Sequence, residues 1–237
     1  MEALRETCIS PTPLLIRDLP RDERPRHRLL ENGSQSLSDT ELLSILLRNG
    51  RPGASSIDVA RGLLEHHGGL AGLQGLSPEA LQVPGVGPAK AATILAAVEL
   101  AQRLARATVP DRDPMSRPAA VARYLALRYQ FSEQEIMGAL YLDTRNRLVA
   151  ERELFRGTLN RAAVEPRMIL KHGLLRDAAG VALFHTHPSG DPAPSAEDLA
   201  FTRRVADAGD VVGIRLVDHL ILGSGSRWVS LRQRGTC

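Results

Sequence analysis

The sequence predicts an α/β protein of two domains: a small all-α domain followed by a larger domain with a mixed sheet. Three observations indicate this fold class. Apolar residues recur at helical spacing before position 107, the polar and proline-bearing segment ATVPDRDPMSRP follows, and short apolar runs then alternate with helical stretches. We therefore expect a helical domain at 1–106, an interdomain linker at 107–117 and an α/β domain at 118–237.

The helices of the first domain are predicted from their caps and breakers. Ser38 and Glu41 form a capping-box pattern ahead of the apolar run LLSILL, and Asn49-Gly50 supplies a stop. A short helix is expected to begin at Ser77, a good N-cap that precedes a proline. Longer helices are expected at 56–67 and at 88–105.

The second domain shows strands and helices in alternation. Apolar runs suited to strands lie at 138–142, 147–150, 181–187 and 219–222, and helical stretches lie at 118–129, 166–176 and 196–208. This alternation predicts a mixed sheet with helices packed on it.

Composition places few limits on the partners. The net charge of +3 permits a nucleic-acid partner, yet residues 1–106 carry twelve basic and twelve acidic side chains, so any DNA contact there has to be local. The sequence has no apolar stretch of membrane-spanning length, and its charged N-terminus is unlike a signal peptide, so we expect a cytoplasmic protein with no membrane contact. Cys8 and Cys237 are expected to be free thiols.

One short segment, FHTHPSGDPAPSAED, contains a candidate metal site. His185 and His187 end an apolar strand run, and a strand directs residues i and i+2 to the same face, so both imidazoles can reach one cation. A rigid turn with a glycine and prolines follows, and Asp198 lies in the first turn of the next helix. Two histidines and one carboxylate, with a fourth position left for water, are typical of a catalytic zinc site.

A purely structural interpretation of the same residues also exists. Ser195 and Asp198 match a capping box, and histidines in strands often only pack or form hydrogen bonds. A His-x-His pair alone is therefore weak evidence. The strand context, the turn and the aspartate at this spacing together favour the metal site.

These residues resemble a known family. The C-terminal half is similar to JAB/MPN-type (JAMM) metalloprotease domains, and nearly the whole chain is similar to bacterial RadC proteins. The resemblance is carried by HTHPSGDPAPSAED at 185–198, LVDHLILG at 216–223 and IRDLPRDERPRHRLL at 16–30, with ELFRGTLN at 153–160 and VPGVGPAK at 83–90. It implies a Zn²⁺ ion bound by His185, His187 and Asp198, with Ser195 donating a hydrogen bond to the developing oxyanion.

The resemblance also implies a catalytic glutamate upstream of the metal ligands. In JAMM domains a glutamate at the start of a strand acts as general base toward the water that the metal activates, and Glu135 in QEIMGALYLD matches that position. Competing carboxylates are Glu133, Glu151, Glu153 and Glu165, each of which is otherwise an exposed charge.

The chain departs from the family pattern at a few positions. Met168 stands where RadC relatives usually have glutamate, and we expect a changed surface or packing contact with the metal ligands intact. Thr186 replaces the usual asparagine, and its side chain should point away from the metal. Asp218 and His219 match the family without a derivable role, and a structural hydrogen bond is favoured over a second metal site.

The first domain contains a helix-hairpin-helix pattern at VPGVGPAKAATILAAVEL. Gly85 and Gly87 permit a tight turn before a helix N-terminus that favours phosphate, and Lys90 in the first helical turn could add a charge contact. Such contacts predict sequence-independent DNA binding. The alternative is a protein-binding scaffold, because this half lacks the aromatic residues on which bases stack.

Three classes of function follow from the sequence. The favoured class is a zinc metallopeptidase or isopeptidase acting on an unknown protein or peptide. A DNA-processing phosphodiesterase is less favoured, because such sites commonly hold two metals about 4 Å apart and need more carboxylates. The third class is a non-catalytic DNA-associated adaptor. The sequence identifies neither the substrate nor the oligomeric state.

Overall fold

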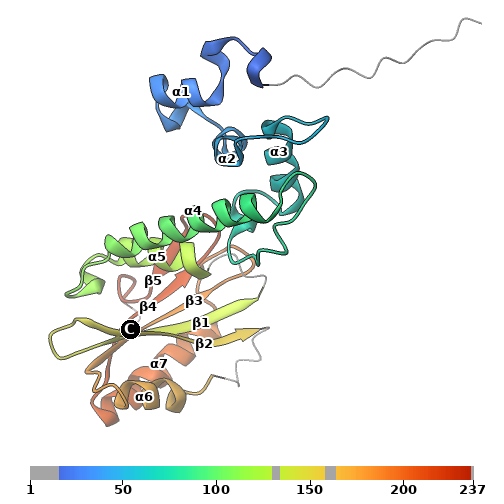
Figure 1. The fold of residues 1–237 in the computed structure, drawn as a ribbon. Helices are drawn as coiled ribbons and strands as arrows, with labels where there is room; N and C mark the ends of the chain where they lie inside the picture. The colour runs from blue at the N-terminus through green and yellow to red at the C-terminus, as the bar shows by residue number, and fades with distance from the viewer. Residues whose placement is uncertain (1–15, 130–133, 158–163, 236–237) are drawn as a thin grey trace, which may run out of the picture. The chain divides into compact units, whose positions relative to one another are not determined.

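The computed structural model describes residues 16–129, 134–157 and 164–235, and the chain divides into two compact units, Met1–Val98 and Glu99–Cys237 (Figure 1). Cys8 and Cys237 lie outside the described residues. The α-helices are α1 (Pro25–Asn32), α2 (Asp39–Leu47), α3 (Ser56–His66), α4 (Pro88–Ala107), α5 (Pro118–Tyr129), α6 (Pro166–Leu174) and α7 (Ala196–Val212). Short 3-10 helices lie at Ile16–Asp18, Arg21–Glu23, Ser34–Ser36, Ala71–Leu73 and Pro114–Ser116.

The N-terminal unit is helical, as the sequence predicts. The capping box at Ser38 is formed with both of its hydrogen bonds, and Ser55 makes a second one with Asp58 ahead of α3. The core of this unit is built from apolar side chains of α2, α3, α4 and the segment between α3 and α4, namely Leu43, Leu47, Val59, Ala60, Leu63, Leu64, Leu73, Leu81, Val86, Ala91 and Ile94.

One element expected in this unit is not a helix. From Ser77 onward the chain forms a turn, in which the Ser77 hydroxyl accepts a hydrogen bond from the Ala80 amide at 3.2 Å. The cap is therefore present, but Pro84 follows closely and disfavours helical backbone at the residue before it. Too few residues remain for a helix to propagate. By contrast, α1 was not expected and begins with Pro25 at its first turn.

The C-terminal unit contains a mixed five-stranded sheet, which confirms the predicted fold class. Its strands are β1 (Glu135–Leu142), β2 (Leu148–Gly157), β3 (Gly180–Thr186), β4 (Arg215–Leu222) and β5 (Trp228–Ser230). Their order across the sheet is β2-β1-β3-β4-β5. β3 and β4 run parallel, and the other neighbours run antiparallel. A helical crossover, α7, joins the parallel pair, as parallel strands require.

Helices cover both faces of this sheet (Figure 1), and the alternation of β1 and β3 decides which residues face which helices. One face packs against α5 and carries, among others, Ile136, Leu140 and Phe184. The other face packs against α6 and α7 and carries Met137, Ala139, Tyr141, Val181 and Leu183. The odd-numbered positions of β1 and β3 therefore face α7.

The sheet extends further than the sequence indicates. β2 continues to Gly157, beyond the expected run at 147–150, and β5 was not expected at all. β2 is an edge strand whose side chains are half-buried or exposed, so many of its residues are charged and no apolar run marks its length. β5 has only three residues. The extent of β2 and the presence of β5 therefore depend on pairing with the neighbouring strands β1 and β4, and not on a local apolar pattern.

The segment expected to be a linker packs on the second unit. Val109 and Met115 are buried in the core between α5 and the sheet, and the Asp113 amide donates to the Asn146 carbonyl at 2.6 Å. Along the chain, the division between the two compact units falls between Val98 and Glu99, within the residues of α4. The proline-bearing segment thus differs from a solvated linker because Val109 and Met115 are buried. Among the described residues, no helix combines the length and apolar character needed to span a membrane.

Candidate metal centre

The two histidines of the strand and the aspartate of α7 meet on one face of the sheet. His185 follows Val181 and Leu183 with the two-residue period of β3, so it faces α7, and His187 continues that direction just past the strand end. Asp198 lies in the first turn of α7, which packs on the same face. His185 and Asp198 are buried.

The ligand atoms of these three side chains converge on one point. The two Nε2 atoms of His185 and His187 lie 2.8 Å apart, and the Asp198 carboxylate lies 3.3 Å from His185 Nε2 and 3.6 Å from His187 Nε2. Tetrahedral zinc with bonds near 2.1 Å separates its ligand atoms by about 3.4 Å. The two histidine–aspartate separations are within about 0.2 Å of that value and the separation of the two Nε2 atoms is about 0.6 Å shorter, so a small opening between the rings lets these residues fit a metal ion.

The turn after β3 fixes the ring of His187. Gly190 takes a left-handed φ of +79°, and its amide donates to the His187 carbonyl at 2.9 Å. The Asp191 carbonyl then lies 2.7 Å from His187 Nδ1. Since a carbonyl only accepts, Nδ1 carries a proton, and Nε2 is the ring atom that faces His185 and Asp198 and that the neutral imidazole would offer to a metal.

The geometry shows the capping interpretation of Ser195 and Asp198 and is compatible with the metal-binding interpretation. A complete capping box opens α7, in which the Ser195 hydroxyl and amide donate to Asp198 Oδ2 at 2.6 and 2.7 Å. This cap orients the carboxylate toward the histidines. The Ser195 hydroxyl points to Asp198 in this arrangement, so a role as oxyanion donor stays a prediction and requires that the hydroxyl turn away from the cap.

The electrostatic environment of the site favours an ionised Asp198 carboxylate beside the imidazoles. Burial raises the pKa of Asp198, but hydrogen bonds from His187 and Ser195 and the charge of His185 outweigh burial and hold that pKa below its ordinary value. The hydrogen bond to Asp198 raises the pKa of His187, against the opposing effect of burial. Without a metal, Asp198 is therefore an anion that attracts a cation to this point.

Glu135 reaches the same two histidines from the neighbouring strand. It is two residues before Met137, which pairs with His185 across β1 and β3, so the strand period places it on the α7 face. Its carboxylate and the ring nitrogens of His185 and His187 lie within 4.8 Å of one another. Glu135 thus borders the centre as predicted, close enough either to ligate a metal or to move a proton there.

Thr186 contributes to the position of Glu135. Its side chain points away from the histidines, as expected, and its hydroxyl accepts a hydrogen bond from the Ile136 amide at 2.9 Å. That amide follows Glu135 directly, so the contact ties the start of β1 to the end of β3.

The competing glutamates are engaged elsewhere or lie outside the described residues. Glu151 accepts hydrogen bonds from the hydroxyls of Tyr124 and Tyr129, both at 2.7 Å, on the α5 side of the sheet. Glu153 pairs with Arg156 and Glu165 pairs with Arg167. Glu133 lies outside the described residues.

The roles of Asp218 and His219 are resolved by their contacts. Asp218 is buried and accepts from the Ser230 hydroxyl and from the His219 and Arg232 amides, which is the structural hydrogen-bonding role favoured from the sequence. His219 is different, because its Nε2 lies 2.8 Å from His185 Nδ1. Burial lowers its pKa to about 4, so it is neutral near pH 7. No spacing pattern reveals this contact, since it depends on the parallel register of β3 and β4.

Met168 behaves as a surface residue. Its side chain lies near the start of α6 and is 41% exposed, and it takes no part in the cluster of His and carboxylate side chains. The substitution therefore leaves the candidate metal ligands in place.

Lys90 of the helix-hairpin-helix segment contacts backbone carbonyls, whereas the sequence predicted a contact with phosphate. Its ammonium donates to the carbonyls of Asn49, Gly50 and Gly85 at 2.6, 3.2 and 2.7 Å. These contacts use all three of its donors. Gly85 takes a φ of +98° against Val59, whereas Gly87 faces open space. Sequence-independent DNA binding by this hairpin stays a prediction, and Lys90 serves the fold of the turn.

Lys90→Met is expected to lower the stability of the N-terminal unit by about 2 kcal/mol, because half-buried carbonyls lose a charged donor. Urea unfolding followed by circular dichroism measures this change. Lys171→Met is a matched control, since Lys171 is the other lysine, is exposed, and lies in the second unit. Its effect should stay within about 0.5 kcal/mol. If the two variants were equally stable, Lys90 would not stabilise the turn and would be an ordinary surface charge.

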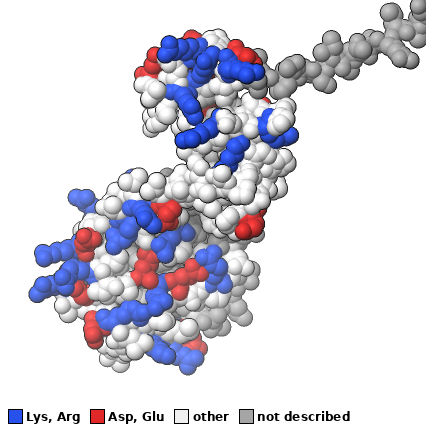
Figure 2. Space-filling view, in the orientation of Figure 1, with Lys and Arg blue, Asp and Glu red and all other residues white. Residues whose placement is uncertain are grey.

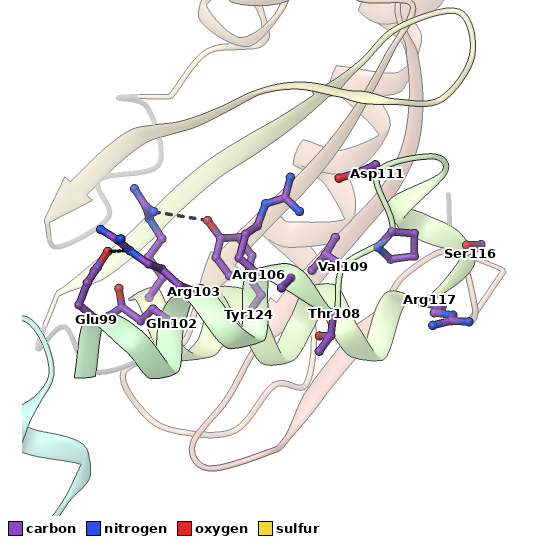
Figure 3. Close-up of a pocket in the computed structure, with 13 residues that line it drawn as sticks. Glu99, Gln102, Arg103, Arg106, Thr108, Val109, Asp111, Ser116, Arg117 and Tyr124 are labelled. Atoms are coloured by element: carbon purple, nitrogen blue, oxygen red, sulfur yellow. Dashed lines mark hydrogen bonds and ion pairs between the residues drawn. The ribbon is translucent and has the colours of Figure 1, made fainter. Parts of the chain in front are cut away.

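A separate cavity of about 930 Å³ lies in the C-terminal unit between α4 and α5 (Figure 3). Its lining contains Arg103, Arg106, Arg117 and Arg128, and Arg103 is paired with Glu99. None of its lining residues belongs to the metal cluster. Acidic and basic side chains are interspersed over the face of this unit seen in Figure 2, so that face is not of one sign of charge.

Two family descriptions match this chain. The RadC-like JAB domain matches residues 115–236, and the UPF0758 N-terminal family matches residues 16–92. A UPF0758 protein of Geobacillus kaustophilus is 43% identical over 93% of the chain and 98% of its own length. UPF0758 proteins of Alcanivorax borkumensis and Xanthomonas oryzae are each 42% identical, over 94% and 93% of the chain and 99% and 98% of their own lengths.

The first match contains every residue of the candidate metal centre, and the relatives align with both units. The sequence resemblance to RadC proteins is thereby confirmed. The chain belongs to the UPF0758 family of RadC-like JAB domain proteins.

Proposed function

We propose that this protein is a zinc-dependent hydrolase that cleaves an amide bond, peptide or isopeptide, in a protein or peptide substrate. The observation that carries the proposal is the convergence of His185 Nε2, His187 Nε2 and the Asp198 carboxylate on one point, with Glu135 beside it. Zinc bound there would polarise a carbonyl and lower the pKa of water toward about 7. His185, His187 and Asp198 would supply three ligands and leave a position open.

The chain's own residues have distinct tasks in this proposal. Glu135 takes a proton from the attacking water and delivers it to the leaving amine, which suits a carboxylate within reach of the ligands but outside the His and Asp set. Ser195, at the start of α7, would donate to the oxyanion after leaving its cap on Asp198. Burial of His185 and Asp198 keeps bulk water from the ligands.

A phosphodiesterase is less well supported. Two-metal sites need further carboxylates about 4 Å from the first metal. In the part of the chain that the structure describes, the candidate ligands form a single cluster around His185 and His187, whose ring nitrogens lie within 4.8 Å of the Glu135 carboxylate. With Asp198 included, these residues suffice for one metal ion.

Cleavage assays with two substrate classes test the proposal. The full chain is expected to hydrolyse members of a fluorogenic peptide and isopeptide library, to lose that activity with a chelator, and to regain it with added zinc. Duplex and single-stranded DNA should remain intact. Chelator-sensitive cleavage of DNA would favour the phosphodiesterase, and absence of activity on either class would favour the adaptor.

A further inference from the structure

The second histidine contact of the centre leads away from the metal and into the core. His185 Nδ1 lies 2.8 Å from His219 Nε2, and His219 Nδ1 lies 2.7 Å from the Thr202 hydroxyl. His185, His219 and Thr202 are all fully buried, with exposed fractions of 0%. Thr202 is one helical turn after Asp198 on α7.

The directions of these hydrogen bonds follow from the backbone carbonyl of Asp198, which can only accept. The Thr202 hydroxyl lies 2.6 Å from the backbone carbonyl of Asp198, so its single hydrogen is donated there. Its oxygen must then accept from His219 Nδ1, which places the proton of the neutral imidazole on Nδ1. His219 Nε2 is left as an acceptor.

The same reasoning determines the tautomer of His185. Because His219 Nε2 accepts, His185 Nδ1 carries the proton and His185 Nε2 presents a lone pair toward His187 and Asp198. A chain of three hydrogen bonds thus begins at the backbone of one candidate ligand, Asp198, and ends by orienting another, His185.

We propose that Thr202 and His219 are positioning residues that lock His185 in the Nδ1-protonated tautomer and so prepare its Nε2 to bind metal. The inference rests on the metal centre of the proposed function, but it makes no assumption about the substrate. Ligand histidines commonly need such a partner, and loss of the partner typically costs 10–100-fold in metal affinity.

Two matched pairs of variants separate positioning from packing. His219→Met removes the acceptor, whereas His219→Gln of similar size retains one. Thr202→Val removes the hydroxyl, whereas Thr202→Ser retains it. Zinc affinity, measured by competition with a chromophoric chelator, is expected to fall 10–100-fold in the Met and Val variants and to stay within about threefold in the Gln and Ser variants. Circular dichroism and thermal unfolding of the metal-free proteins check their folding.

Long-range ¹H–¹⁵N NMR of the metal-free full chain reads the tautomers without any metal or activity. His185, His187 and His219 should all be protonated at Nδ1, and Thr202→Val should change the tautomer ratio of His219 and His185 but not that of His187. A His219 proton on Nε2 in the wild-type protein would overturn the inference. Equal losses of zinc affinity in both members of each pair would also overturn it, since packing alone would then explain them.

The two measurements distinguish failure of this inference from failure of the proposed function. If the wild-type chain binds no zinc, the proposed function fails, while the NMR tautomers still decide whether Thr202 and His219 lock His185. If zinc binds with equal affinity in wild type and His219→Met, the metal centre stands and the positioning role is wrong.

Discussion

Asp198→Asn is expected to weaken zinc binding by more than about a hundredfold, while the wild-type chain holds about one zinc ion. Loss of a direct ligand should cost more than loss of its outer partners, for which 10–100-fold is usual. Asparagine keeps the shape of the side chain but removes the negative charge that lies 3.3 Å from His185 Nε2. Elemental analysis and chelator competition measure the occupancy and the affinity.

The control is Asp207→Asn, an exposed position on the same helix, which should keep about one equivalent of zinc. His187→Ala should lose most of its zinc for the same reason as Asp198→Asn. Full occupancy in either ligand variant would contradict the assignment. If Asp198→Asn kept zinc and Glu135→Gln lost it, Glu135 would be the third ligand, an arrangement that its closeness to both histidines also allows.

The convergence of the candidate ligands His185, His187 and Asp198 was largely predictable because local periodicity determines it. His185 and His187 share a face through the two-residue period of β3, and Asp198 is placed by its cap and by the turn before α7. Each of these relations extends over a few residues of sequence. The position of Glu135 came instead from the family resemblance, and the pairing of Met137 with His185 now gives its physical reason.

The parts that the sequence did not predict depend on contacts between distant segments. His219 reaches His185 only because β4 lies beside β3 in parallel register, which no local pattern specifies. Lys90 looked like a phosphate ligand because it lies in the first turn of α4, but the carbonyls it contacts at Asn49 and Gly50 are forty residues away in sequence. Only the start of β2 was predicted, because beyond the apolar run at 147–150 this edge strand is largely charged.

Glu135→Gln is expected to retain zinc and folding while hydrolytic activity falls by roughly a hundredfold to ten-thousandfold, the usual contribution of a positioned acid or base. Glutamine keeps the size and the hydrogen-bonding capacity of the side chain but removes its proton acceptor. The hydrogen bond from the Ile136 amide to Thr186 holds the start of β1 in either variant, so the substituted side chain should occupy the same place. Zinc content and the turnover of the best peptide substrate are measured on the same preparation.

The matched control is Glu153→Gln, which removes a carboxylate of β2 that pairs with Arg156 and has no contact with the centre. It should retain activity within about threefold, because exposed ion pairs contribute little to stability or to a distant site. Zinc loss in Glu135→Gln would make Glu135 a ligand, and a fourth protein ligand would close the site to water and favour a structural metal. Full activity with zinc retained would mean that another group moves the proton. The position of Glu135 alone is compatible with a ligand and with a general base. Zinc content and turnover change independently in these outcomes, so measuring both distinguishes the two roles.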